Sequence, residues 1–441
     1  MNRREFLRQT GLASAGAFAA PYILPSGRLF ARSGNRIANH VVFVLFGGGI
    51  RNQESVDQLF LATQGGPSGN IMPNMLAGAT PTDPMSLYEE WTPAGAPLTS
   101  QGTLFRNMRY ASGPTGHYNG HTVAMTGNYT ETGLTLNVNP QMPTIFEYYR
   151  KHSDPGLSAL NAWWMSIELG PYPALNYSRH PQYGPQYGAN YLMPDYGAGD
   201  LAADYFGTLQ ALHPEEVSRI GNMRSFLDGN FGKEPWDLPG IRNTDEDRLA
   251  IQKLYLDVLN GTNPMEWPLP PGIPDWKISG DGVNIAASWK VLQEFKPELM
   301  VVNTTNCDVA HDNTSLAIQQ IYKADYAVGW LWQKIQSDPV LANDTIMICM
   351  PEHGRNLEFN HLTDDNGLRA TDHTNDENSR DIFGLIVGPP DKVVQGQVVG
   401  APTSNVGESI DIVPTIARIL GFDDRIPSGM LPGRFLNEAF V

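Results

Sequence analysis

The sequence predicts an α/β fold with a mostly parallel central sheet and helices on both of its faces. Short continuous apolar runs, typical of strands that are buried on both faces, recur along the chain. Segments with the periodicity of amphipathic helices alternate with these runs. Because alternating strands and helices form parallel sheets, we expect this architecture rather than a sandwich or a helical bundle.

Four apolar runs predict buried parallel strands. The first ends at three consecutive glycines, which predict a tight turn. The runs cover residues 40–46, 298–303, 344–350 and 382–387. Ligands of such sheets bind beyond the carboxyl ends of the strands, so we expect a functional site after these runs.

Helical periodicity is clearest in residues 315–335 and 408–420, and Gly421 follows the second segment as expected of a helix C-cap. We expect residues 36–441 to form one domain with insertions near 170–200 and 262–280. The first insertion is crowded with Tyr, Pro and Gly, and the second is proline-rich. Such loops either shape a binding cleft or are plain surface excursions.

Composition excludes some classes of function. The net charge of −16 argues against nucleic acid, since binding a phosphate backbone requires clustered Lys and Arg. After the N-terminal segment, no stretch reaches the roughly 18 apolar residues of a membrane helix, so we expect no stable membrane span. The two cysteines, Cys307 and Cys349, predict buried thiols, with a single disulfide as the alternative.

The N-terminus indicates export. Residues 2–8 read N-R-R-E-F-L-R, and a short apolar stretch of small residues follows. Adjacent arginines before such a stretch are typical of twin-arginine signals, whereas a basic tail on a cytosolic protein is the alternative. We assign residues 1–35 to signal and linker. This predicts transport by the twin-arginine translocase to the periplasm or the extracellular space.

Histidines and acids gather in segments that follow the predicted strands. They lie in T-G-H-Y-N-G-H from Thr115, N-C-D-V-A-H-D from Asn306, P-E-H-G-R from Pro351 and T-D-H from Thr371. Imidazole and carboxylate are ligands for zinc, manganese or iron. A single histidine in such a loop is more often an ordinary hydrogen-bonded residue than a metal ligand. The set, placed after strands that should be neighbours, predicts one site for divalent metal ions.

These segments, in this order, resemble the alkaline phosphatase superfamily, which includes sulfatases and nucleotide phosphodiesterases. The C-terminal S-I-D-I-V-P-T-I-A-R-I-L-G and the following P-S-G-M-L-P-G-R resemble its closing helix. The chain is most similar to poorly characterised, twin-arginine-exported, sulfatase-like members. The resemblance implies an alkaline-phosphatase-like fold, and metal ligands at Asp308, His311, Glu352, His353 and His373. Asp312 is an alternative to Asp308.

The catalytic pattern of the superfamily is incomplete here. Gly48 stands at the position of a metal-binding Asp, Glu352 replaces another Asp, and His117 stands at the position of the nucleophile. We therefore expect His117 to ligate a metal ion or to act as the catalytic nucleophile itself. Thr115 or Thr122 would replace it only if the loop were shifted.

Two functions follow from these observations. The first is a metal-dependent hydrolase of phosphate or sulfate esters on a small molecule or a glycan. Arg51, Asn119 and Arg355 are its predicted substrate-binding residues, and ordinary ion pairing is the alternative for the two arginines. The second is a catalytically degenerate member that acts as a periplasmic binding or structural protein.

Overall fold

The computed structural model describes residues 36–83, 85–130, 139–153, 158–166, 175–192, 194, 241, 243–374 and 376–441. The proposed export signal lies outside these residues, as do residues 170–174, 193 and 195–200 of the first insertion. Within the described part of the chain, no helix is long and apolar enough to cross a membrane.

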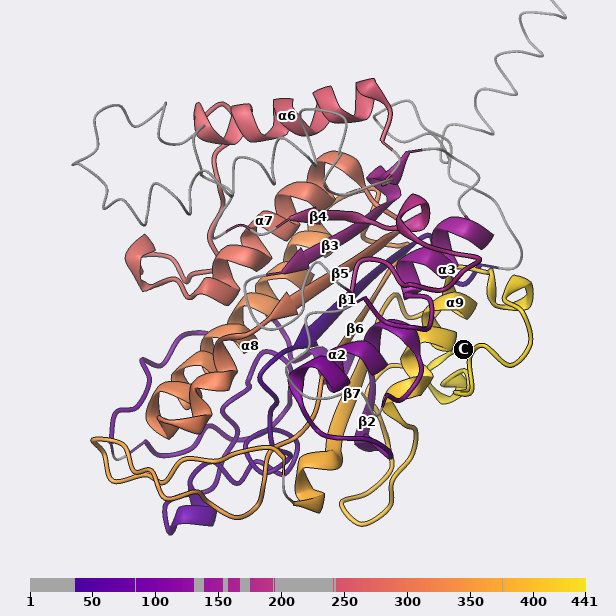
Figure 1. Cartoon of the computed structure of the whole chain (residues 1–441). Helices are drawn as coiled ribbons and strands as arrows, with labels where there is room; N and C mark the ends of the chain where they lie inside the picture. The colour runs from indigo at the N-terminus through magenta and orange to yellow at the C-terminus, as the bar shows by residue number, and fades with distance from the viewer. Residues whose placement is uncertain are drawn as a thin grey trace, which may run out of the picture.

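Eight strands form one sheet in the order β4-β3-β5-β1-β6-β7-β2-β8 (Figure 1). They are β1 His40–Phe46, β2 Gly102–Arg109, β3 Ala162–Ser166, β4 Asn190–Leu192, β5 Leu299–Thr304, β6 Thr345–Pro351, β7 Asp381–Val387 and β8 Gln397–Val399. Strand β1 pairs in parallel with β5 and with β6. The predicted α/β fold with a mostly parallel sheet is confirmed, and the ends of β5, β1 and β6 lie at one edge.

Strand β7 differs from the prediction, because it pairs with β6 in antiparallel orientation. A parallel neighbour would need a crossover connection, usually through a helix. Residues 352–380 contain only the short 3₁₀ helix η10, Glu377–Arg380, among their described residues. The segment between β6 and β7 therefore reverses the chain direction without passing over a face of the sheet.

Helices cover both faces of the sheet. In Figure 1, α7 (Gly280–Phe295) and α8 (Thr314–Ser337) lie on one side, and α2 (His117–Thr126), α3 (Ile145–His152) and α9 (Ile412–Ile419) lie on the other. The predicted helix at 315–335 matches α8. The predicted helix at 408–420 begins as the 3₁₀ helix η11, Ser409–Asp411, and continues as α9. Gly421 takes a φ of 70°, as a glycine after a helix end should.

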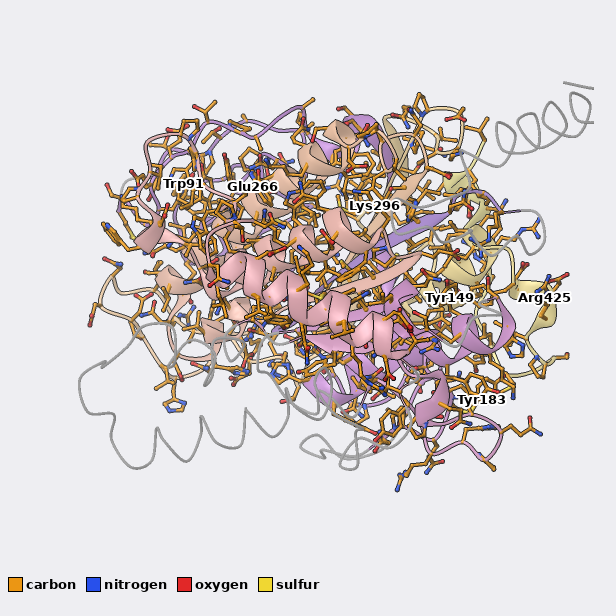
Figure 2. All side chains as sticks on the ribbon, turned by 90° about the horizontal axis from the view of Figure 1, so that it is seen from above. Trp91, Tyr149, Tyr183, Glu266, Lys296 and Arg425 are labelled. Atoms are coloured by element: carbon orange, nitrogen blue, oxygen red, sulfur yellow. The ribbon has the colours of Figure 1, made fainter. Side chains whose placement is uncertain are left out.

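Alternate side chains of β1 point into two different apolar clusters, one on each face of the sheet. Residues 42, 44 and 46 belong to the apolar cluster that includes α7 and α8, whereas residues 41, 43 and 45 belong to the cluster that includes α3 and α9. Tyr149 in α3, labelled in Figure 2, donates its hydroxyl proton to the buried Glu298 at 2.8 Å. Full burial of a Val, Leu or Phe side chain stabilises the folded state by about 1.5–3 kcal/mol relative to leaving it exposed. The first cluster also contains Cys349 and Cys307, both buried free thiols, as predicted.

The first insertion contributes to the core, although the sequence predicts a surface loop there. Its residues 190–192 form β4, which extends the sheet beside β3, and Tyr191 and Leu175 are buried. Tyr183 and Tyr191 therefore serve packing in this segment. The second insertion is a loop that ends at η8, Asp275–Lys277, where Trp276 is largely exposed, as predicted.

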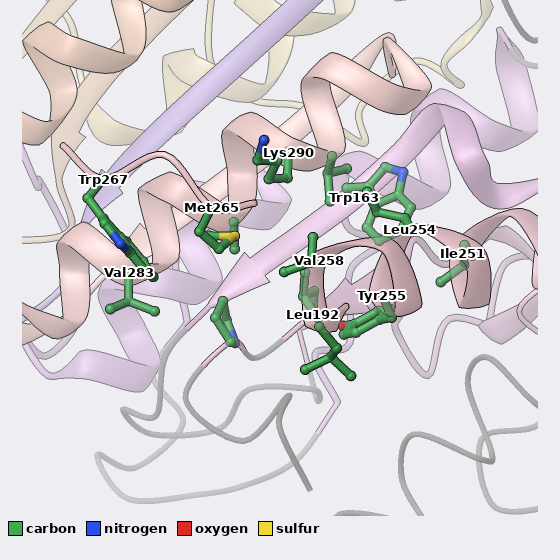
Figure 3. A pocket seen from close by; sticks show the side chains of 14 residues that line it. Trp163, Leu192, Ile251, Leu254, Tyr255, Val258, Met265, Trp267, Val283 and Lys290 are labelled. Carbon is green, nitrogen blue, oxygen red and sulfur yellow. The ribbon is translucent and has the colours of Figure 1, made fainter. Parts of the chain in front are cut away.

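An apolar cavity of about 300 Å³ lies between α6 (Asp245–Leu259), α7 and β3 (Figure 3). Trp163, Ile251, Tyr255, Met265 and Val283 are among the side chains that line it. It contains none of the predicted site residues. The candidate site is elsewhere, at the carboxyl ends of the central strands.

Candidate metal centre

The predicted ligands come together from four segments. Asp308 and His311 lie on the 3₁₀ helix η9, Asn306–His311, directly after β5. Glu352 and His353 follow β6 directly. His117 is the first residue of α2, and His373 lies in the loop before β7. Because β5 and β6 flank β1 in parallel, their following segments meet at one edge.

The ligand atoms form two groups that share His117. One group contains His117, Asp308, His311 and His373, and the other contains His117, Glu352 and His353. Within each group, one ligand atom per residue lies within 4.8 Å of the others. The imidazole rings of the four histidines in these groups pack closely, and the centroids of His353 and His373 lie 4.2 Å apart. Asp308 joins a group and its alternative Asp312 does not.

Three histidines are held by acceptors at the same ring nitrogen. Nδ1 of His311 lies 2.7 Å from Asp372 Oδ1, Nδ1 of His353 lies 2.7 Å from the Gly354 carbonyl, and Nδ1 of His373 lies 2.5 Å from the Thr115 carbonyl. Carbonyl and carboxylate oxygens only accept, so each Nδ1 donates its proton. This tautomer leaves the lone pair of Nε2 toward the group, and it is the arrangement found around metal-binding histidines.

His117 uses both of its ring nitrogens. Its Nδ1 lies 2.8 Å from Glu352 Oε1 and 3.4 Å from His353 Nε2, whereas its Nε2 lies 3.3 Å from Asp308 Oδ1. Burial alone would lower the pKa of His117, but the carboxylates of Glu352 and Asp308 outweigh burial and raise it to about 10. The ring therefore carries a proton near neutral pH in the metal-free protein, and it is engaged by two carboxylates.

In two other histidines of the site, His353 and His373, the pKa is shifted in the opposite direction. Burial lowers the pKa of His353 to about 4, although Glu352 opposes this. Burial, together with the neighbouring His353 and His117, also lowers the pKa of His373. Both rings are neutral near pH 7, which is the form that binds a metal ion.

Glu352 is fully buried and is surrounded by donors. His121, one turn after His117 on α2, forms an ion pair with Glu352 Oε2, and its Nε2 lies 2.7 Å from Asn303 Oδ1. Burial raises the pKa of Glu352, but electrostatic interactions with the neighbouring His121, His353 and His117 rings, together with the hydrogen bond from His117, outweigh it and lower the pKa well below the usual range. The carboxylate is therefore ionised and fixed in position.

The glycine turn after β1 packs directly against the ligands. The backbone N–H of Gly48 donates to Glu352 Oε1 at 2.6 Å, and Gly48 has a φ of 89°. A Cβ atom at Gly48 would lie 2.4 Å from the backbone nitrogen of Asp308. The aspartate that the superfamily has at this position does not fit this packing. The Gly48 backbone contacts Glu352 instead.

The two predicted substrate-binding arginines contact protein groups. Nη2 of Arg355 donates to Asp308 Oδ1 at 2.6 Å, its Nη1 donates to the Thr371 carbonyl, and the side chain is buried. Arg51 forms a bidentate ion pair with Glu54 and is also buried. Arg355 thus positions a predicted ligand, and Arg51 braces the turn after β1. These contacts correspond to the ion-pairing alternative.

The remaining predicted residues have local partners. The amide of Asn119 donates to the Thr130 carbonyl at 3.1 Å, within the segment after α2. The hydroxyl of Thr115 donates to the His373 carbonyl, and Thr122 lines a cavity with Tyr118 and Thr126. The roles of His121 and Asp372 were not predicted, although the four-residue spacing of His117 and His121 on a helix places both on one face.

No protein-family model and no curated protein sequence matches the chain. Solved structures of the alkaline phosphatase superfamily are similar to it. A member from Vibrio parahaemolyticus is 13% identical with a TM-score of 0.43, over 100% of this chain and 80% of that chain. The phosphonate monoester hydrolase of Agrobacterium radiobacter is 14% identical with a TM-score of 0.46, over 91% and 77%.

The lipoteichoic acid synthase LtaP of Listeria monocytogenes is 10% identical with a TM-score of 0.42, over 96% of this chain and 79% of that chain. The Vibrio parahaemolyticus structure is described as a member of the superfamily that the sequence motifs resemble. Likenesses at such identities assign no substrate and no site residue, so the chemistry of the site depends on its own geometry.

Proposed function

We propose that the protein is an exported, metal-dependent hydrolase of phosphate or sulfate esters. The observation that carries this proposal is the common orientation of His311, His353 and His373. Each ring donates through Nδ1 to an acceptor and turns Nε2 toward a carboxylate-containing group. Such an arrangement directs imidazole lone pairs and carboxylate oxygens toward shared positions, as binding of a cation requires. The donor set suits zinc, manganese or iron.

In this proposal Asp308, His311 and His373 hold one ion, and Glu352 and His353 hold a second, with His117 between them. A bound divalent cation supplies Lewis-acid chemistry, which polarises an ester oxygen and promotes the ionisation of water. Asp308, with 24% of its side chain exposed, marks the open side of the site, whereas Glu352 is fully buried. The ester therefore approaches from the Asp308 side.

The surroundings favour an anionic substrate. Helix α2 begins at His117, so the positive end of its dipole lies at the site. Since Arg51 and Arg355 contact protein groups, the bound cations and this helix end are the positive elements that would receive the ester anion. A small-molecule ester and a glycan ester both satisfy this requirement.

Export is part of the proposal. Its support is the pair Arg3 and Arg4 ahead of a short apolar stretch. We propose transport through the twin-arginine translocase to the periplasm or the extracellular space.

A second function is favoured by one specific observation. Thr115, the hydroxyl residue beside His373, donates its hydroxyl proton to the His373 carbonyl, which leaves it hydrogen-bonded to the backbone rather than directed at a substrate. Cys307 is buried, and burial raises the pKa of its thiol, which keeps it protonated. A catalytically degenerate protein that binds metal or an anionic ligand would retain this geometry without turnover.

Turnover distinguishes the two functions. The purified protein would be loaded with zinc, manganese or iron and assayed with aryl phosphate, phosphonate and sulfate esters. The hydrolase proposal predicts turnover that a chelator removes and that the double variant His311→Ala/His373→Ala lacks. His361→Ala, which changes an exposed histidine outside the site, is the matched control and should retain full activity. Bound metal without turnover on any ester class would favour the binding protein.

A further inference from the structure

We infer that His117 bridges two metal ions as an imidazolate, one ion at each ring nitrogen. This inference rests on the proposed metal centre and goes further, because it makes the centre dinuclear through a single side chain. The two ligand groups overlap only at His117. In this inference His117 is a metal ligand, which is one of the two roles expected from the sequence, and it is not the catalytic nucleophile.

The argument starts from the direction of the two nitrogens. Nδ1 of His117 faces Glu352 Oε1 at 2.8 Å and His353 Nε2 at 3.4 Å. Nε2 faces Asp308 Oδ1 at 3.3 Å, and the same carboxylate oxygen lies 3.3 Å from His311 Nε2. Each nitrogen of one ring therefore lies against a different carboxylate and a different histidine.

The other histidines cannot bridge in this way. In His311, His353 and His373, Nδ1 is occupied by an oxygen acceptor, so only Nε2 is available to a cation. The neighbours of His117 on both sides are instead potential ligands. The bridge is inferred from this difference. In His117, both ring nitrogens face candidate ligands, whereas in the other three rings only Nε2 does.

The position of His117 also suits a bridge mechanically. It is the first residue of α2, and the next helical turn carries His121, which forms an ion pair with the same Glu352. The ring is thus fixed between β6 and η9 by a helix rather than by a mobile loop. About one-fifth of its side chain is exposed, so cations can reach it from solvent.

The charge and proton balance is simple. Binding of two divalent ions releases both ring N–H protons of His117 to solvent, and the lone pairs that remain on Nδ1 and Nε2 become the metal ligands. No bond within the ring changes and no redox step is required. The imidazolate, Asp308 and Glu352 neutralise the two ions only in part. The excess positive charge would favour an anionic ester at the open side.

Copper(II) provides a direct test that does not depend on activity. Two copper ions bridged by imidazolate couple antiferromagnetically, and their low-temperature electron paramagnetic resonance signal is lost in large part. The metal-free protein would be titrated with Cu²⁺, with bound copper measured by elemental analysis. We expect two copper ions per chain and a signal far below that of the same amount of isolated copper.

His117→Ala should restore full signal intensity per bound copper, and added imidazole should suppress it again by filling the vacated position. Circular dichroism would verify that the variant folds, and His361→Ala should behave as wild type. Two bound copper ions with full intensity in the wild type would overturn the bridge and leave the metal centre standing. A single bound copper ion would also overturn the bridge. No bound copper at all would overturn the proposed function as well.

Discussion

The ring of His311 donates from Nδ1 to Asp372 Oδ1 over 2.7 Å, and its Nε2 lies 3.3 Å from Asp308 Oδ1. The carboxylate of Asp372 therefore holds the ring with its free nitrogen toward the site. It also accepts from the Asn360 amide at 3.1 Å, which fixes the carboxylate itself. Loss of such an outer partner reduces metal affinity by about 10–100-fold in proteins that use it.

Asp372→Ala should accordingly weaken metal binding by about 10–100-fold. Asp372→Asn, which keeps an acceptor oxygen but removes the charge, should have a smaller effect. Affinities would be measured by competition with a chromogenic chelator. Asp365→Ala, at an exposed position of the same loop, is the matched control. Wild-type affinity in Asp372→Ala would show that the His311–Asp372 contact has no part in metal binding.

Metal binding should strengthen as the pH rises from about 6 to about 9. The pKa of His117 is about 10, so the ring is protonated over this range and bound cations must displace its N–H protons. Each displaced proton makes the apparent affinity rise about tenfold per pH unit. His353, with a pKa of about 4, adds no dependence in this range.

The same chelator competition would measure this pH dependence. His117→Ala should give a shallower slope, because the protonated ring is gone. An affinity that does not change with pH in the wild-type protein would contradict the protonated state of His117 between Glu352 and Asp308.

Gly48→Ala should destabilise the protein more than Gly65→Ala. Both glycines have positive φ angles, 89° and 80°, so both substitutions carry the strain of a left-handed backbone, roughly 1–2 kcal/mol. Only at Gly48 would the new Cβ meet other atoms, with the Asp308 nitrogen 2.4 Å away, whereas nothing lies within 4 Å at Gly65. Overpacking adds about 1–3 kcal/mol.

Denaturant unfolding of the two variants would measure this difference. Gly65→Ala controls for backbone strain, so the excess loss in Gly48→Ala reports on the contact with η9. Equal losses of unfolding free energy would mean that the turn after β1 moves freely away from Asp308.

Replacement of Arg3 and Arg4 by lysine should leave the protein in the cytoplasm, because the paired arginines define the signal. Fractionation followed by immunoblotting would locate the protein, and Arg8→Lys, just beyond the pair, is the control. Unchanged recovery of the double variant outside the cytoplasm would rule out this export route.

The sequence predicts the sheet well where the chain follows simple rules. The observed strands β1, β5 and β6 lie within one residue of the apolar runs, because strands buried on both faces are continuously hydrophobic. Their parallel order explains why clusters more than 40 residues apart in sequence meet. Strand β7 is a similar apolar run, but its direction depends on the loop before it.

In the site, too, some features follow from the sequence pattern and others depend on local geometry. Strand order explains why Asp308, His311, Glu352, His353 and His373 lie near one another, and their role as metal ligands stays a prediction. The inward direction of Arg355 and the position of His117 between two carboxylates depend on loop and helix geometry that no sequence period encodes. Likewise, β4 is too short and too polar to be distinguished from a loop.

Metal content of the purified protein tests the central claim most directly. Elemental analysis after reconstitution with zinc, manganese or iron should find two ions per chain in the wild type and in His361→Ala. The double variant His311→Ala/His373→Ala should lose the ion held by the Asp308 group. A wild-type protein that binds no transition metal after reconstitution, or a double variant with unchanged metal content, would contradict the account.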